Sequence, residues 1–143
     1  MTTTAKMPPF RADHVGSLLR PAPVAGARAA GTTGDALQAI EDAEIPRLIK
    51  MQEDAGLQAI TDGEARRAFW HYDFMDMLTG LDIEQDTGEG FSFAGVTSPG
   101  VFPAINGPLD FPDDHPMLDH FRFVARHTER CPKISIPGPS AVH

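Results

Sequence analysis

The chain has 143 residues, of which 41% are hydrophobic and 22% charged, and this balance is typical of one globular domain. Its formal net charge of −8 argues against nucleic acid as the main partner, because phosphate binding requires basic surfaces. The single cysteine excludes an internal disulfide, and no apolar run approaches the ~18 residues that a membrane helix needs. The first residues also lack the apolar stretch of a secretory signal. We therefore expect a cytoplasmic protein with no membrane partner.

The first sixty residues predict an alternation of strands and helices. After a lead-in over 1–9, expected to be flexible, residues 10–19 predict a strand that ends in a Gly-Ser turn. A short alanine-rich helix is expected over 21–30, and a longer one over 37–55 carries a broad apolar face. Pro46 either kinks the longer helix or begins a second segment, and Gly56 is predicted to end it. A short apolar strand follows at 59–61.

The stretch Thr-Asp-Gly-Glu at 61–64 joins this strand to the next predicted helix. The helical pattern begins at once, with apolar residues at helical spacing: Trp70, Phe74, Met77 and Leu78. In a parallel α/β sheet such a junction lies at the carboxyl edge, where binding sites are built. Glu64 is therefore a candidate binding residue. The alternative is an acid that the helix dipole favours at a first turn.

The second half of the chain predicts one further strand and helix after an insertion. Residues 81–112 predict an inserted hairpin or long loop. A helix is expected from His115-Pro116, with a buried stripe of Met117, Phe121, Val124, Ala125 and Thr128. A third strand is predicted at 133–137, followed by a turn at 138–140. Three parallel strands would leave open sheet edges. We therefore expect an α/β fold that is either a fragment of a (β/α)₈ barrel or a piece that requires a partner chain.

Three segments, in order, resemble the cobalamin-independent methionine synthase family, and most closely the single-barrel relatives of its catalytic domain. They are FRADHVGSLLRP at 10–21, QEDAGLQAITDGEARRAFWHYDF at 52–74 and KISIPGPS at 133–140. The resemblance implies the N-terminal part of a (β/α)₈ TIM barrel with about three strands. It also implies transfer of a methyl group from methyl-tetrahydrofolate to the thiol of homocysteine, with zinc favouring the thiolate.

The resemblance also implies roles for individual residues. The backbone of Val15 and the backbone and hydroxyl of Ser17 would bind the carboxylate of the amino acid, and Glu64 would bind its amino group. Amide donors suit a carboxylate, and a carboxylate suits an ammonium group. Ser17 closing a turn is the alternative reading. Three further residues are possible contacts, each with a structural alternative: His14 (a hydrogen-bonded strand end), Asp62 (a turn or cap) and Trp70 (core). No catalytic residue is assigned.

The zinc ligands of the family, a His-x-Cys pair, a glutamate and another cysteine, lie in later strands. Cys131 is outside any such motif, so zinc ligands are expected downstream and no metal site is predicted within the chain. Two other functions stay open. One is a related zinc-dependent alkyl transferase acting on another thiol such as coenzyme M, which would not need Glu64. The other is a non-catalytic binding or assembly fragment that forms a homo-oligomer or pairs with a missing C-terminal segment.

Overall fold

The computed structural model describes residues 10–69, 71–85, 91–98 and 100–142. These residues form a mixed α/β structure of short sheets and helices, and no closed barrel is present among them. The chain divides into two compact units, which are described separately. The described residues of the first unit are 10–67 and 117–135, and those of the second lie within 68–116 and 136–142. The predicted lead-in at 1–9 and the side chain of Trp70 lie outside the described residues.

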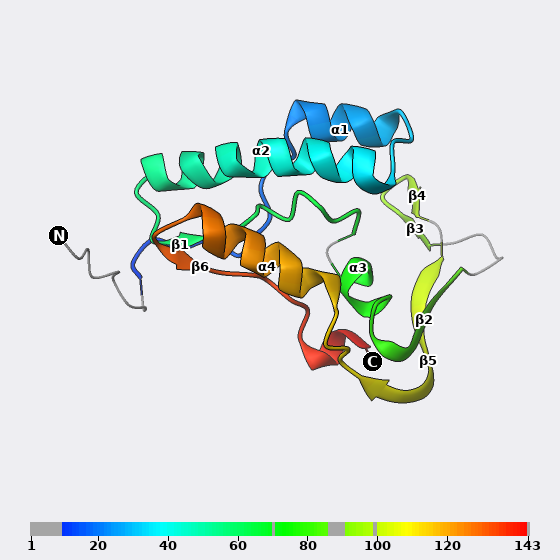
Figure 1. The fold of residues 1–143 in the computed structure, drawn as a ribbon. Helices are drawn as coiled ribbons and strands as arrows, with labels where there is room; N and C mark the ends of the chain where they lie inside the picture. The colour runs from blue at the N-terminus through cyan, green and yellow to red at the C-terminus, as the bar shows by residue number, and fades with distance from the viewer. Residues whose placement is uncertain (1–9, 70, 86–90, 99, 143) are drawn as a thin grey trace. The chain divides into compact units, whose positions relative to one another are not determined.

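The first unit contains two neighbouring helices, α1 (Ala22–Ala29) and α2 (Gly34–Asp54), which run alongside one another (Figure 1). Both predicted helices are confirmed. Helix α2 is one element that includes Pro46, so the alternative of a second segment beginning there is wrong. The helix ends as predicted at Gly56, whose φ of 88° is in the left-handed region and whose N–H donates to the Glu53 carbonyl at 3.0 Å. No described helix is long and apolar enough to span a membrane.

The core of this unit lies where α2 and α4 (Pro116–His127) pack against β1 (Ala59–Ile60). Its buried members come from these elements and the turn after β1: Ile45, Leu48, Ile49, Ile60, Ala65 and Val124. The predicted helix from Pro116 is confirmed, but its buried stripe is partly wrong. Phe121 and Ala125 are exposed, whereas Phe123 packs against the core. The face of α4 that meets α2 is therefore rotated relative to the predicted one.

Strand β1 pairs in parallel with β6 (Cys131–Pro132), two residues earlier than the predicted strand at 133–137. Directly after β1, the side chain of Gln52 binds both backbone groups of Thr61. Its amide oxygen accepts from Thr61 N–H at 2.9 Å, and its amide nitrogen donates to the Thr61 carbonyl at 2.8 Å. A buried side chain thus replaces a strand partner at Thr61.

The predicted strand at 10–19 is wrong, because this segment forms no backbone ladder. The carbonyls of residues 14–16 instead accept hydrogen bonds from three side chains, those of Lys133, Ser135 and Thr61 in that order. One backbone bond completes the set, from Leu18 N–H to the Gly63 carbonyl at 3.0 Å. The segment therefore lies against β1 and residues 133–135 without becoming a strand of their sheet.

The second unit contains antiparallel strands and one short helix, α3 (Tyr72–Met75). Strand β2 (Thr79–Gln85) pairs with β5 (Val101–Asp110), and β3 (Phe91–Phe93) pairs with β4 (Val96–Ser98). Ala94 and Gly95 both have positive φ, 48° and 82°, as in a type I′ hairpin turn. A 3₁₀ turn, η1 (Pro139–Val142), ends the described chain. The region 81–112 thus consists largely of antiparallel β-structure.

Candidate functional site

The turn at 61–64 places Glu64 in an unusual backbone conformation. The Asp62 carboxylate accepts from Glu64 N–H at 2.9 Å, and the Thr61 hydroxyl accepts from Gly63 N–H at 3.0 Å. These bonds accompany left-handed φ values of 68° at Gly63 and 56° at Glu64. For a residue with a side chain this conformation costs roughly 1–3 kcal/mol. The chain cannot enter a right-handed helix here, so the helix predicted to begin directly after Glu64 is wrong, and only α3 forms.

The Glu64 carboxylate lies against Gly16, the glycine of the predicted Gly-Ser turn. A Cβ atom placed on Gly16 would be 2.9 Å from Glu64 Oε1 and 2.4 Å from Ser135 Oγ. Both distances are shorter than any normal contact of a Cβ atom, so glycine allows this close approach. The structure therefore brings together the two segments that the sequence predicted to bind the two ends of an amino acid.

Glu64 is a buried carboxylate with few partners. The residue is 8% exposed. Among the described residues, its side chain forms an ion pair with Arg67 at 3.7 Å, which is longer than a hydrogen bond. The buried side chain of Arg67 also donates to the Ser135 carbonyl. A buried carboxylate is normally stabilised by several short hydrogen bonds, so Glu64 has unused acceptor capacity among the described residues.

The segment that faces Glu64 presents backbone and small side chains. The side chain of Val15 is 86% exposed, and its carbonyl accepts from the Ser135 hydroxyl. Ser17 is exposed, and no hydrogen bond of its hydroxyl is found among the described residues. The Ser17 hydroxyl is thus accessible to a ligand.

His14 and Asp62 both have clear structural partners. His14 Nε2 lies 3.0 Å from the buried Gln52 amide oxygen, which connects the segment to α2. Asp62 is buried and orders the turn through Glu64 N–H. These contacts correspond to the structural alternatives stated for the two residues. They leave Glu64 and the 15–17 segment as the part of the site with free binding capacity.

Sequence reasoning missed two side chains that shape this region, Lys133 and Ser135. Lys133 donates to the carboxylate of Asp13 at 2.7 Å, and this hydrogen bond lowers the Asp13 pKa. Ser135 contacts the 15–17 segment: its hydroxyl donates to the Val15 carbonyl and lies beside Gly16. The spacing of Lys133 and Ser135 was the available signal, because residues two apart in an extended chain share one face.

The surroundings of the turn are strongly charged. Burial first, and then Arg66 and Arg67, lower the pKa of His120 on α4 to about 4, while Asp62 opposes this change. Arg66 forms ion pairs with Asp42 and Glu41 and lies over the ring of Phe123 at 4.8 Å. Burial raises the pKa of Glu41 despite this pairing. Arg66 and Arg67 are therefore both in ion pairs.

The described residues do not fit a zinc ion, because no three of their His, Cys, Asp or Glu side chains come together as a possible metal site.

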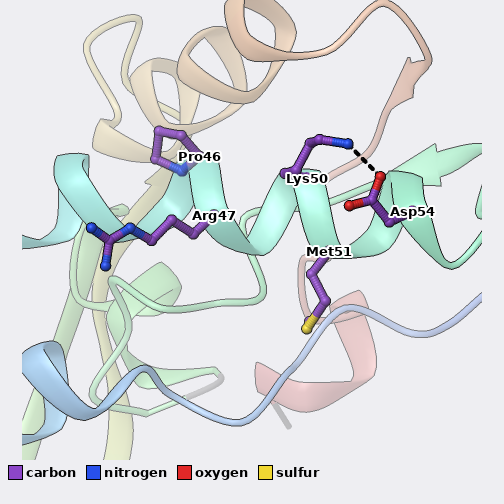
Figure 2. Close-up of a pocket in the computed structure, with 5 residues that line it drawn as sticks. All are labelled: Pro46, Arg47, Lys50, Met51 and Asp54. Carbon is purple, nitrogen blue, oxygen red and sulfur yellow. Dashed lines mark hydrogen bonds and ion pairs between the residues drawn. The ribbon is translucent and has the colours of Figure 1, made fainter.

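A pocket is present on the exposed face of α2, lined by Pro46, Arg47, Lys50, Met51 and Asp54 (Figure 2). An ion pair between Lys50 and Asp54 crosses part of it. This face is opposite the core side of the helix and contains none of the predicted site residues. The pocket is therefore separate from the Glu64 turn.

Comparisons with known proteins relate the chain to longer proteins. No family model matches it. It is 44% identical over 141 residues to "Uncharacterized protein YxjG" and 41% identical over 144 residues to "Uncharacterized protein YxjH", both from Bacillus subtilis. These matches cover 94% and 97% of the chain, but only 36% and 38% of the two relatives.

A solved structure is similar at the level of the fold. It is the crystal structure named "Putative Vitamin-B12 Independent Methionine Synthase" from Listeria monocytogenes, with a TM-score of 0.72 and 35% sequence identity. The match covers 94% of the chain and 38% of that protein. The chain is therefore similar, in sequence and in structure, to part of a protein with this name.

Proposed function

We propose that the chain is the N-terminal part of a methionine-synthase-like methyltransferase, and that it binds the amino-acid end of homocysteine. The observation that carries the proposal is the buried, under-partnered Glu64 carboxylate lying against Gly16. The similarity to the Listeria monocytogenes protein supports a related function. In the whole protein, a (β/α)₈ barrel would move a methyl group from methyl-tetrahydrofolate to the homocysteine sulfur.

In this proposal each end of the amino acid meets a group of opposite charge or polarity. The Glu64 carboxylate accepts hydrogen bonds from the ligand ammonium, an interaction strengthened because both partners are charged. The Val15 backbone and the Ser17 backbone and hydroxyl donate to the ligand carboxylate. Arg67, at 3.7 Å from Glu64, is the cation that pairs with this carboxylate.

The methyl-transfer step requires groups outside the described residues. Zinc favours the thiolate form of a bound thiol, which is the nucleophile in such a transfer. Since the described side chains form no metal site, we propose that the zinc ligands and the folate site come from other parts of the protein. The chain itself would supply binding and orientation of the amino acid.

The test compares L-homocysteine with 4-mercaptobutanoate, the same thiol acid without the amino group, by NMR titration of the 143-residue chain. We expect homocysteine to bind about tenfold more tightly, because a hydrogen bond to a charged group contributes ~1.5–3 kcal/mol. Glu64→Gln should remove this preference while the unfolding midpoint changes little. Glu129→Gln, an exposed acid in the same unit, is the matched control and should keep the preference.

Each of the following results would contradict the proposal. Unchanged homocysteine affinity in Glu64→Gln would show that the carboxylate does not bind the amino group. Equal loss of binding and of folding would show that Glu64 is chiefly structural. Equal affinity of the wild-type chain for both thiols would instead favour an alkyl transferase acting on an aminoless thiol such as coenzyme M. A stable oligomer that binds neither thiol would favour the assembly fragment.

A further inference from the structure

We propose that Arg20 and Arg28 are positioning residues that hold the Glu64 turn in its left-handed conformation. The two arginines lie at opposite ends of α1: Arg20 is two residues before its first residue, and Arg28 is in its last turn. Among the described residues, the hydrogen bonds of both arginines go to groups other than the Glu64 side chain. This inference rests on the proposed role of Glu64, and it assigns to α1 the task of fixing where that carboxylate lies.

The contacts that carry the inference are made to backbone carbonyls just after Glu64. Arg28 donates to the Arg66 carbonyl at 2.6 Å, and Arg20 donates to the Arg67 carbonyl. Both arginines also approach the Ala65 carbonyl at 3.4 Å. Because no helix follows Glu64, these three successive carbonyls lack helical partners and would otherwise be unsatisfied. The arginines replace the missing helix as the source of hydrogen-bond donors.

The shape of the arginine side chain suits this task. Its planar guanidinium offers several N–H donors in a fixed geometry, so one side chain can reach neighbouring acceptors at once. Arg20 does so, because its Nε and Nη2 approach the carbonyls of Ala65 and Arg67. The Arg28 nitrogen that binds the Arg66 carbonyl also lies 2.8 Å from the buried carboxylate of Glu41 on α2. Arg28 therefore ties the turn to α2 as well as to α1.

The two arginines differ in what their removal would leave behind. Loss of Arg28 would leave Glu41 with one fewer partner in a buried environment, which is strongly destabilising in general. Among the described residues, Arg20 donates only to the turn carbonyls, so its removal leaves no buried charge without its partner. Arg20→Gln is thus the cleaner test. The second variant is Arg28→Lys, which keeps the positive charge beside Glu41 but loses the planar guanidinium.

The first measurement is amide hydrogen exchange, which does not depend on any ligand. The Glu64 N–H bonds to Asp62, and the Arg67 N–H bonds to the Glu64 carbonyl at 3.1 Å. We expect Arg20→Gln to accelerate exchange about tenfold at these two amides, because the turn opens more often. The Lys133 N–H, bonded to the Ile60 carbonyl, should be unaffected. Arg122→Gln, which removes an exposed pair with Asp119, should change none of the three.

The second measurement is the preference for homocysteine over 4-mercaptobutanoate. If the arginines position Glu64, Arg20→Gln and Arg28→Lys reduce this preference about tenfold and leave the affinity for the aminoless thiol nearly unchanged. If the arginines had a purely structural role, the two variants would bind both thiols more weakly and by the same factor.

The two measurements separate failure of this inference from failure of the proposed function. Unchanged exchange at Glu64 and Arg67 in both variants would overturn the positioning role, as would equal acceleration at Lys133 or an unchanged thiol preference in the variants. If the wild-type chain shows no preference for the amino-bearing thiol, the proposed function fails, and the exchange data alone decide whether the arginines hold the turn.

Discussion

The turn at 61–67 and the ribbon of β2 and β5 are stabilised in different ways. The turn has little regular structure, and its backbone groups are bound by side chains from α1 and α2. In the ribbon the backbone pairs with itself from Leu81↔Ile105 to Gln85↔Val101. Large apolar side chains of β5 remain exposed there, including Phe102, Ile105 and Leu109. Side-chain hydrogen bonds therefore stabilise the backbone conformation of the turn, whereas backbone pairing stabilises that of the ribbon.

This contrast predicts where single substitutions matter. In the unit that contains the turn, one substitution can remove a hydrogen bond or a core contact and change the geometry of the site at the same time. In the ribbon, most exposed side chains can be shortened without loss of a backbone bond. The following changes test the contrast, from the largest expected effect to the smallest.

Ile49→Ala should produce the largest loss of stability. Ile49 is 2% exposed in the core between α2, β1 and α4, and its truncation leaves a cavity that costs roughly 2–5 kcal/mol. The same change in the ribbon, Ile105→Ala, removes a side chain that is 55% exposed and should cost less than about 0.5 kcal/mol. Urea unfolding followed by circular dichroism measures both. Similar losses would show that the ribbon depends on its side chains as the core does.

His120→Gln should remove a pH dependence of stability. In the folded protein the His120 pKa is lowered from 6.5 to about 4. Between these values the unfolded chain binds a proton that the folded protein excludes, so the free energy of unfolding falls as the pH falls, by up to roughly 3 kcal/mol. Urea unfolding at pH 7, 6, 5 and 4 should give a flatter profile for His120→Gln. His127→Gln, an exposed position on α4, is the control, and an identical profile in both variants would refute the expectation.

Gly16→Ala should have a smaller effect on stability and a clear one on the site. The added methyl group would meet Ser135 Oγ at 2.4 Å and the Glu64 carboxylate at 2.9 Å, so we expect a loss of about 1–3 kcal/mol and weaker homocysteine binding. Gly26→Ala should instead increase the stability. Gly26 lies in α1 with no atom within 4 Å of the added carbon, and alanine stabilises a helix interior by up to about 1 kcal/mol relative to glycine. Thermal unfolding of both variants measures the difference, and a neutral Gly16→Ala would mean that the segment can shift freely.

Helices α1, α2 and α4 were predictable because their signals are local. The apolar spacing of α2, the proline at the start of α4 and the glycine after α2 each act within a few residues. The strands at 10–19 and 133–137 were predicted wrongly for a different reason. The side chains of Lys133 and Ser135 bind the carbonyls of His14 and Val15, and both lie far along the chain from the residues they bind.

The candidate site was predictable in its parts but not in its assembly. The sequence indicated Glu64 and the 15–17 segment, and the structure places them in contact through Gly16. The left-handed conformation of Glu64 has no sequence signal of its own, since glutamate rarely adopts it. Nor could spacing reveal that Arg20 and Arg28 bind the carbonyls after it, because those contacts depend on how α1 packs beside α2.

The positive φ of Glu64 also has a consequence for laboratory evolution of this protein. Glycine adopts a φ of 56° without the steric cost that glutamate bears, and it would place no charge in a buried position. A library screened only for heat resistance should therefore enrich glycine at position 64. A library screened for capture of an amino acid should retain the glutamate. If the two libraries select different residues at position 64, the difference in thermal stability between them measures the stability that the protein loses by keeping a binding group there.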